Sequence, residues 1–400
     1  MTKERHFFEG CVKDGEEIWF SASRENAICK KNLRTGEFCV ADQFETYHSA
    51  MHLHSSVFLD RGVLYFVPAN ADALAAYRIA DRTCRYYGVS KLHVYGVTNG
   101  APFYHYESAV QIGRRLYMIS LLSPDITVFD LDKETMETIY IRELDFRNHA
   151  YHHTFCKDGV VWDKKLYLAV YGSSQLLELD TDSYAYRILE YPDDQASFSC
   201  MAQDQNVFYL MDHTHAALVR YDARTGTFDR LLHGFAGADT GGLFGKCLYR
   251  KQKLYLFQNY SDSFYIYDIG QGCSVSVDAG ACPPEEADLF CEERMESKYY
   301  AFWQAKDGIF FYYAPLDLIY RLDDQGRLFR VPFFDSRAGK ELMMHRLSQV
   351  QNTEVYVEAL PQDLELFLKN SSPNGKNAAR AGKTTVGGRI YRELGKGAGT

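Results

Sequence analysis

The chain has 400 residues, of which 46% are hydrophobic and 24% are charged, values that exclude a disordered protein. The formal net charge is −9, and because residues 371–400 carry +5, residues 1–370 carry −14. Nucleic acids and anionic membranes bind to basic surfaces, so this acidic body predicts no nucleic-acid partner.

Targeting and redox signals favour a cytoplasmic protein. The start of the sequence, MTKERHFFEG, leads into charged sequence without the apolar core of a signal peptide. No run of about 18 apolar residues is present, so we expect no membrane span. The ten cysteines are scattered without a C-x-x-C pair, which favours reduced thiols. We also expect a monomer.

A short motif recurs along the chain: a polar turn, an aliphatic–aromatic pair, and a hairpin that ends in aromatic–Asp. Neighbouring copies are 41 to 55 residues apart, close to the length of a propeller blade. From the apolar anchor to the residue before the Asp position there are 13 residues in six copies and 14 in one. The abundance of Tyr (30) and Phe (26) favours strands. The anchors are Ile18, Leu64, Leu116, Leu166, Val207, Leu254 and Ile309.

The second copy shows how one blade is expected to form. Residues 55–60 are the predicted inner strand, followed by strands at 64–68, 74–79 and 84–89. Asp60 and Gly62 supply the chemistry of a tight turn between the first two strands. The inner strand of the first copy is predicted within residues 6–14.

These units predict an all-β fold, a seven-bladed β-propeller of four-stranded blades with a short C-terminal extension. The propeller is assigned to residues 1–337. Residues 338–370 are a ring-closing or helical extension, and residues 371–400 a flexible basic tail rich in Ser, Gly, Asn and Lys. Because the first copy has its own inner strand, the ring does not require a strand from the C-terminus, although residues 329–360 contain candidates. Six or eight blades remain alternatives.

An acidic residue ends the third strand of most copies. A repeated acid is compatible with a ladder of metal ligands, but Asp also binds the backbone amides two residues later in a tight turn. We therefore predict turn capping at these positions, which are Asp130, Asp180, Asp222, Asp268 and Asp323, with Asn32 in the first copy.

Polar residues gather in the segments that precede inner strands or join second to third strands. In propellers, which the repeat resembles, these segments open on one face. Nine of the thirteen histidines fall there. Aromatic residues in equivalent segments would suit flat ligands such as sugar rings. The candidate residues of this mouth are His52, His54, His105, Glu107, Tyr151, His152, His213, His215, Tyr260 and Trp303.

The histidines allow three interpretations. Neutral imidazole is a common ligand of transition metals, and His52, His105, His152 and His213 are the candidates for a Zn, Fe, Mn or Ni site. In such a site Glu107 would act as the base of a lyase or hydrolase. The mouth could instead bind a ligand without metal, or the histidines could only bond to neighbouring backbone. The cofactor is therefore unknown.

Known catalytic motifs are incomplete. The segment AGKTT resembles a phosphate-binding loop, but position 377 is Asn where that loop requires Gly. The single Trp–Asp pair, Trp162–Asp163, precedes a second strand instead of ending a third. H-E-x-x-H and G-x-S-x-G patterns are absent from the sequence. Whether the protein is an enzyme stays open.

The segments KLYLF…FYIYD and VLYFVPANADALAAYR resemble the kelch/galactose-oxidase-like group of bacterial propellers over roughly residues 5–335. A narrower likeness combines FVPANAxxLAxY with a C-terminal element at Gly388, Ile390 and Tyr391. It is similar to uncharacterised propellers encoded near bacterial surface-glycan genes. This resemblance implies a role near glycan synthesis and transfers no catalytic residue.

Fold alone does not determine function. The incomplete motifs and the aromatic residues of the mouth favour a binding propeller that recognises a small-molecule or glycan ligand, or a protein partner. The histidines favour the alternative, a metal-dependent lyase or hydrolase.

Overall fold

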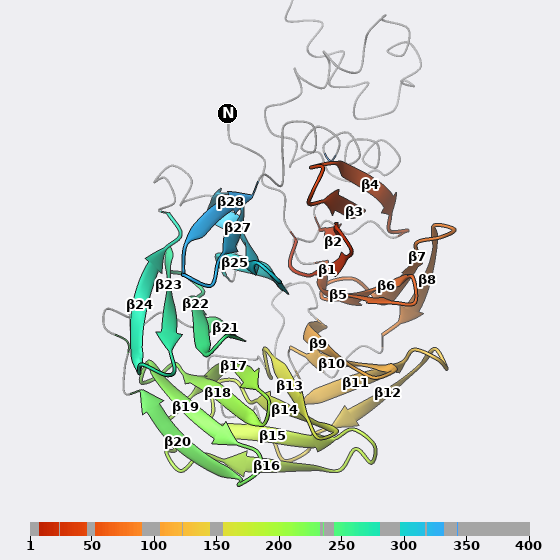
Figure 1. Cartoon of the computed structure of the whole chain (residues 1–400). Coiled ribbons are helices and arrows are strands. Elements are labelled where there is room, and N and C mark those ends of the chain that lie inside the picture. Colours follow the sequence, from red (N-terminus) through yellow and green to blue (C-terminus); the bar gives the residue numbers. More distant parts are fainter. Residues whose placement is uncertain are drawn as a thin grey trace, which may run out of the picture.

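A computed structural model gives the fold as a ring of seven four-stranded antiparallel sheets (Figure 1). Each sheet is one blade and uses four strands that are consecutive in the sequence. This confirms the predicted seven-bladed propeller. The structure describes residues 8–23, 25–45, 53–89, 105–121, 123–144, 155–232, 235, 244–280, 297–316, 318–331 and 342.

The blades follow one another around the ring in chain order. The first blade consists of β1 (Cys11–Asp14), β2 (Glu17–Ala22), β3 (Ala27–Asn32) and β4 (Phe38–Gln43), the second of β5 (His54–Asp60), β6 (Val63–Pro68), β7 (Ala73–Arg78) and β8 (Thr83–Gly88), and the third of β9 (Tyr106–Ile112), β10 (Arg115–Ser120), β11 (Asp125–Asp130) and β12 (Thr135–Tyr140). The fourth blade consists of β13 (Gly159–Trp162), β14 (Lys165–Ala169), β15 (Gln175–Asp180) and β16 (Tyr186–Glu190), and the fifth of β17 (Phe198–Asp204), β18 (Val207–Asp212), β19 (Ala217–Asp222) and β20 (Thr227–Leu232). The sixth blade consists of β21 (Phe244–Arg250), β22 (Lys253–Gln258), β23 (Ser263–Asp268) and β24 (Cys273–Asp278), and the seventh of β25 (Tyr299–Ala305), β26 (Gly308–Tyr313), β27 (Leu318–Leu322) and β28 (Leu328–Val331). A short 3-10 helix, η2 (Ala314–Leu316), lies between β26 and β27.

The predicted strands of the second blade agree with β5–β8 to within one residue at every boundary. The fifth blade explains the one irregular spacing in the repeat. Its buried anchor is Phe208, which pairs with Tyr221, rather than the partly buried Val207. With this register the fifth blade has the same 13-residue spacing as Leu64 and Tyr77 in the second. The anchor predicted at Val207 was therefore one residue early.

The turns between first and second strands have backbone dihedrals that suit tight hairpins. In the second blade, Arg61 and Gly62 have φ values of 47° and 77°. Positive φ at both central residues is typical of the type I′ turn, whose twist matches that of the flanking strands. Glycine adopts this conformation without a steric penalty, which explains its place at the second position.

The repeated acids cap the turns between third and fourth strands, as predicted. The Asp180 Oδ1 atom accepts hydrogen bonds from the backbone amides of Asp182 and Ser183, at 3.1 and 2.8 Å. In the first blade, Asn32 Oδ1 accepts the amides of Arg34 and Thr35. The same arrangement occurs at Asp130, Asp222, Asp268 and Asp323.

The apolar core consists of seven clusters, each between two neighbouring blades. Strand β6 shows how this arises. Its residues Leu64 and Phe66 pack toward the first blade, whereas Tyr65 and Val67 pack toward the third. Because successive side chains of a strand point to opposite faces, both faces of β6 are buried. Central strands of the blades therefore read as continuous apolar runs.

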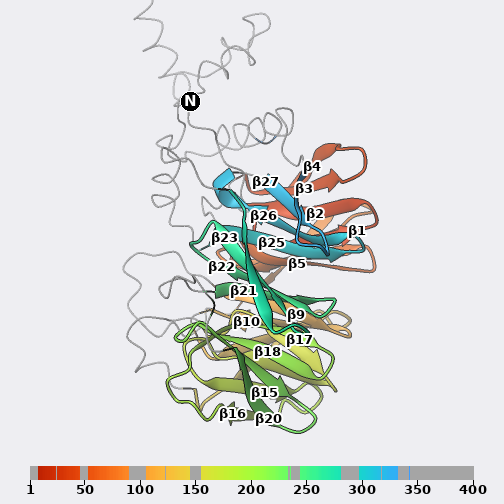
Figure 2. The same ribbon diagram turned by 60° about the vertical axis from the view of Figure 1, so that its left-hand side comes forward.

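The ring closes by direct contact between the seventh blade and the first, which lie side by side (Figure 2). The backbone amide of Ala301 donates to the carbonyl of Glu9 at 2.8 Å. Phe8 is fully buried here and packs on Phe20 and Tyr312, with ring centroids 4.5 and 5.0 Å apart. Leu342, also fully buried, joins this cluster. Closure thus uses packing between complete blades, as the inner strand predicted within residues 6–14 allows.

The predicted propeller boundary at residue 337 lies outside the described residues. The predicted extension, residues 338–370, lies outside them except for Leu342, and so does the basic tail. Among the described residues, no helix is long and apolar enough to cross a membrane. The eight cysteines that the structure describes are free thiols.

Candidate functional site

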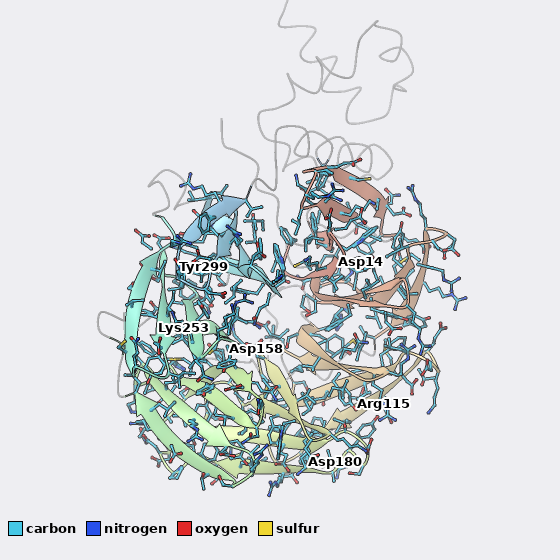
Figure 3. All side chains as sticks on the ribbon, viewed as in Figure 1. Asp14, Arg115, Asp158, Asp180, Lys253 and Tyr299 are labelled. Carbon is cyan, nitrogen blue, oxygen red and sulfur yellow. The ribbon has the colours of Figure 1, made fainter. Side chains whose placement is uncertain are left out.

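A cavity of about 460 Å³ lies between the inner strands of the ring. Such a volume falls in the range of ~300–1,000 Å³ that is typical of small-molecule sites. Its described lining comes from every blade except the fifth. Asp158, which lines it, lies near the middle of the ring, whereas Asp180 lies at the periphery (Figure 3).

Two glycines allow close packing at the wall of this cavity. A Cβ atom on Gly10 would come within 2.6 Å of the Ser56 Cα atom, so the start of the first blade lies directly on β5. A Cβ atom on Gly245 would come within 1.7 Å of Asn259 Oδ1, so this amide packs against the backbone of β21. Backbone contact of this kind fixes where the neighbouring side chains enter the cavity.

Four charged side chains form two ion pairs at the cavity wall. Lys157 Nζ lies 3.8 Å from Glu107 Oε1, and the two side chains are 13% and 15% exposed. Lys246 forms a hydrogen-bonded ion pair with Asp158, whose side chain is 14% exposed. Burial lowers the pKa of Lys246, but the charge and the hydrogen bond of Asp158, with smaller contributions from Cys200 and Cys247, together raise it above its ordinary value. Lys246 is therefore a cation at neutral pH.

An aromatic group adjoins the Lys157–Glu107 pair. Lys157 Nζ lies 5.4 Å from the centroid of the Tyr171 ring, and His213 stacks on that ring at 6.3 Å. Burial raises the pKa of Tyr171, the Lys157 charge lowers it, and Tyr260 and Glu107 make smaller upward contributions. Through Lys157 and Tyr171, the structure thus brings together two predicted mouth residues, Glu107 and His213. Tyr260 is 52% exposed.

His215 belongs to a separate hydrogen-bonded pair in the segment between β18 and β19. Its Nδ1 atom lies 2.6 Å from Asp212 Oδ2. Asp212 is fully buried and also accepts the backbone amides of Ser197 and Thr214. A carboxylate held in this way orients the imidazole and favours the tautomer with hydrogen on Nδ1.

His54 and His105 lie in the packing at the starts of their blades. His54 is 2% exposed, with Nδ1 2.9 Å from Ser21 Oγ and its ring 4.4 Å from that of Phe44. His105 is 7% exposed, and its backbone amide donates to Ala69 O. Burial lowers the pKa of His105, an effect that Asp72 partly offsets. His105 is therefore neutral at physiological pH.

Trp303 lines the cavity from β25 but is only 8% exposed. Its ring stacks on Phe310 at 5.0 Å, between the seventh blade and the first. The Nε1 atom has no hydrogen-bond partner among the described residues. Trp303 therefore packs the seventh blade against the first, with its indole N–H buried.

Three predicted site residues, His52, Tyr151 and His152, lie outside the described residues. Of the four metal candidates, the structure therefore describes only His105 and His213. Among the described residues, no group of three or more His, Cys, Asp or Glu is placed to hold a metal ion.

Sequence reasoning missed the charged residues of the cavity, chiefly Lys157, Asp158 and Lys246. It searched the segments before the inner strands for histidine, the more familiar ligand. The sequence does contain a signal for them. Glu9 and Glu107, and the consecutive residues Lys157 and Asp158, lie at the start of an inner strand or just before it. Comparing charged residues at equivalent blade positions would have found them.

No protein-family model matches the sequence, and no curated protein matches it. Solved structures do share its fold. A streptogramin B lyase is 10% identical, with a TM-score of 0.57 over 78% of this chain and 93% of the lyase. BamB from Moraxella catarrhalis is 11% identical, with a TM-score of 0.51 over 77% of this chain and 82% of BamB.

A third similar structure is the extracellular domain of a one-component system from B. thetaiotaomicron. It is 11% identical, with a TM-score of 0.53 over 79% of this chain and 38% of the other. Identities this low establish a common propeller fold and nothing about activity. They show neither a kelch relationship nor a link to glycan genes.

Proposed function

We propose that this protein is a non-enzymatic binding propeller that takes a glycan-like ligand into its central cavity. The observation that carries the proposal is the cavity itself, about 460 Å³ and lined by two ion pairs, hydroxyl groups and aromatic rings. Sugars expose both hydroxyl groups and apolar C–H faces. A lining that contains both polar and aromatic residues suits both kinds of surface.

Two features of the sequence support this proposal. The likeness to propellers encoded near surface-glycan genes agrees with a glycan ligand. The excess of acid in residues 1–370 disfavours polyanionic ligands. A glycan-synthesis role in the cytoplasm remains part of the proposal.

The cavity can be tested by filling it. Ser108 lines it from β9, so Ser108→Trp is expected to abolish saturable binding of glycans identified on a broad array. The matched control, Ser276→Trp, places the same side chain on the exposed outer strand β24 and is expected to bind like wild type. Isothermal titration calorimetry measures both. Binding that survives Ser108→Trp, or no binding of wild type to any glycan, contradicts the proposal.

One observation favours the alternative, a lyase or hydrolase. Asp212 orients His215: the His215 Nδ1 atom contacts the Asp212 carboxylate, so the His215 Nε2 atom points away from it. An imidazole held in this way suits acid–base work. The metal-dependent version is decided by elemental analysis of protein purified without a His-tag or chelator. One equivalent of a transition metal per chain, lost in the double variant His105→Ala/His213→Ala, would support a metal-dependent lyase or hydrolase. We expect that wild type contains no stoichiometric metal.

A further inference from the structure

The outer strand of the sixth blade, β24, ends its sheet with an edge to which no described strand is paired. The strand order in this blade is β21-β22-β23-β24, so β23 is the described partner of β24. Figure 1 shows β24 at the periphery of the ring. The free edge of a terminal strand presents backbone N–H and C=O groups that can pair with a further strand.

The other blades protect their outer edges with charged side chains, which hinder pairing with another chain. Of the seven outer strands that the structure describes, six hold a charged residue before their last position. One such residue in each strand is Asp42, Arg85, Glu137, Arg187, Asp229 or Arg330. The remaining strand, β24, has the sequence CSVSVD, and its one charged residue, Asp278, is its last.

Strand β24 also lacks two other features that protect an edge. It contains no proline, and it pairs with β23 over six residues without the register shift of a β-bulge. Val275, at the middle of this regular edge, is 57% exposed, and it is the most exposed large hydrophobic residue that the structure describes. A single exposed apolar residue is ordinary on a protein surface. Its place on an uncharged and regular strand edge is what indicates a contact.

The sequence of β24 is complementary to itself. In an antiparallel pair of two such strands about a two-fold axis at Val275, the two Val275 side chains lie opposite each other. Ser274 of each copy then lies opposite Ser276 of the other, and Asp278 lies opposite Gly272. Opposed valines and opposed serines stabilise a strand pair, and no two like charges oppose each other. A second copy of this chain is therefore a partner of matching chemistry.

We propose that β24 is the surface through which two copies of this chain associate, joining their sixth blades edge to edge. The contact is independent of the cavity and goes beyond the proposed function. It also departs from the monomer expected from the sequence. A two-fold contact of this kind uses the same strand on both copies, so it closes after two. One strand edge is smaller than a standard interface, which buries about 800 Å² per partner, so the dimer is weak.

Sedimentation equilibrium of the full chain tests this contact. Wild type is expected to change from monomer to dimer with a dissociation constant between about 10 µM and 1 mM. Val275→Lys is expected to weaken dimerisation about tenfold or more, because two ammonium groups would lie opposite each other. The matched control, Tyr140→Lys, changes an exposed apolar residue on β12, a strand that already carries Glu137, and is expected to dimerise like wild type.

A mixture of two variants tests the register. Val275→Glu is expected to be as monomeric as Val275→Lys, whereas an equimolar mixture of the two is expected to form a heterodimer, because unlike charges then oppose each other. Thermal melting of the dilute variants checks that each one folds. Wild type that stays monomeric up to about 1 mM would overturn the proposal. Equal weakening by Tyr140→Lys would contradict the location on β24, and a mixture that stays monomeric would contradict pairing at Val275.

Discussion

Individual residues show how one side-chain type serves different purposes according to its position. Asp180 caps a turn at the periphery, Asp212 orients His215, and Asp158 pairs with Lys246 at the cavity. These three carboxylates differ in how deeply they are buried and in how many hydrogen-bond donors lie near them. At the turns, nearby backbone amides lower the pKa of the carboxyl group. At the cavity, a lysine from another blade is the partner.

The turn caps predict an acid-sensitive contribution to stability. The amide of Ser183 and its hydroxyl hold the pKa of Asp180 below its ordinary value of 3.8. A carboxyl whose pKa is lower in the folded state stabilises fully above the unfolded pKa and loses this contribution as pH falls through the folded one. We expect Asp180→Asn to lose less stability than wild type between about pH 4 and pH 2, because Asn still accepts the amides.

Thermal denaturation followed by circular dichroism at a series of pH values measures this difference. Asp180→Ala, which removes the acceptor, is expected to have a lower melting temperature than wild type at neutral pH as well. Parallel acid profiles for wild type and Asp180→Asn would contradict the assigned cap.

At the scale of the elements, the inner strands set the dimensions of the cavity by how closely they approach. The segment before β1 lies on β5 because Gly10 has no side chain. The inner strand β25 contains an irregular register between Tyr300 and Trp303, with Ala301 at a φ of 49°. This β-bulge lets Ala301 bond to Glu9 while Trp303 lines the cavity.

Gly10→Ala is expected to destabilise the protein by about 1–3 kcal/mol, the usual effect of overpacking. Its Cβ atom would come within 2.6 Å of backbone, which a change of side-chain rotamer cannot relieve. Gly88→Ala is the matched control, since a Cβ atom there meets nothing within 4 Å. Urea denaturation of both variants measures the difference, and equal midpoints would contradict close contact of the first two blades.

At the scale of the whole molecule, stability resides in seven similar interfaces between blades. Between the described residues of the first and seventh blades, the interface consists of packing and the hydrogen bond from Ala301 to Glu9. The cluster at this interface includes Phe8, Phe20, Tyr312 and the fully buried Leu342. The ring therefore depends on a segment at its N-terminal end.

Phe8→Ala is expected to reduce the free energy of unfolding by about 3–5 kcal/mol, because it leaves a cavity where two rings are packed. Phe329→Ala removes the same side chain from the outer strand β28, where it is 37% exposed and contacts Arg321 and Arg327, and is expected to change stability by no more than about 1 kcal/mol. Guanidinium denaturation followed by tryptophan fluorescence distinguishes them. A neutral Phe8→Ala would show that the N-terminal segment does not hold the ring closed.

The repeat, the strands and their turns could be predicted from the amino-acid sequence. These features depend on local patterns: alternation along a strand, aromatic residues at fixed spacing, and Asp or Gly at turns. The blade boundaries of β5–β8 and the caps at Asp180 and Asn32 followed from such patterns. The irregular spacing at Val207 was misread, because burial rather than residue type selects Phe208 as the anchor.

The pairing of charged side chains between blades depends on the folded ring. Lys246 and Asp158 are 88 residues apart in the chain and come together because inner strands of different blades face one cavity. Sequence reasoning selected histidines as the candidate site residues, but His54 and His105 lie in packing, while Lys157 and Lys246 line the cavity. A local pattern carries no information on such pairs, since ring geometry and close packing at Gly10 and Gly245 determine them.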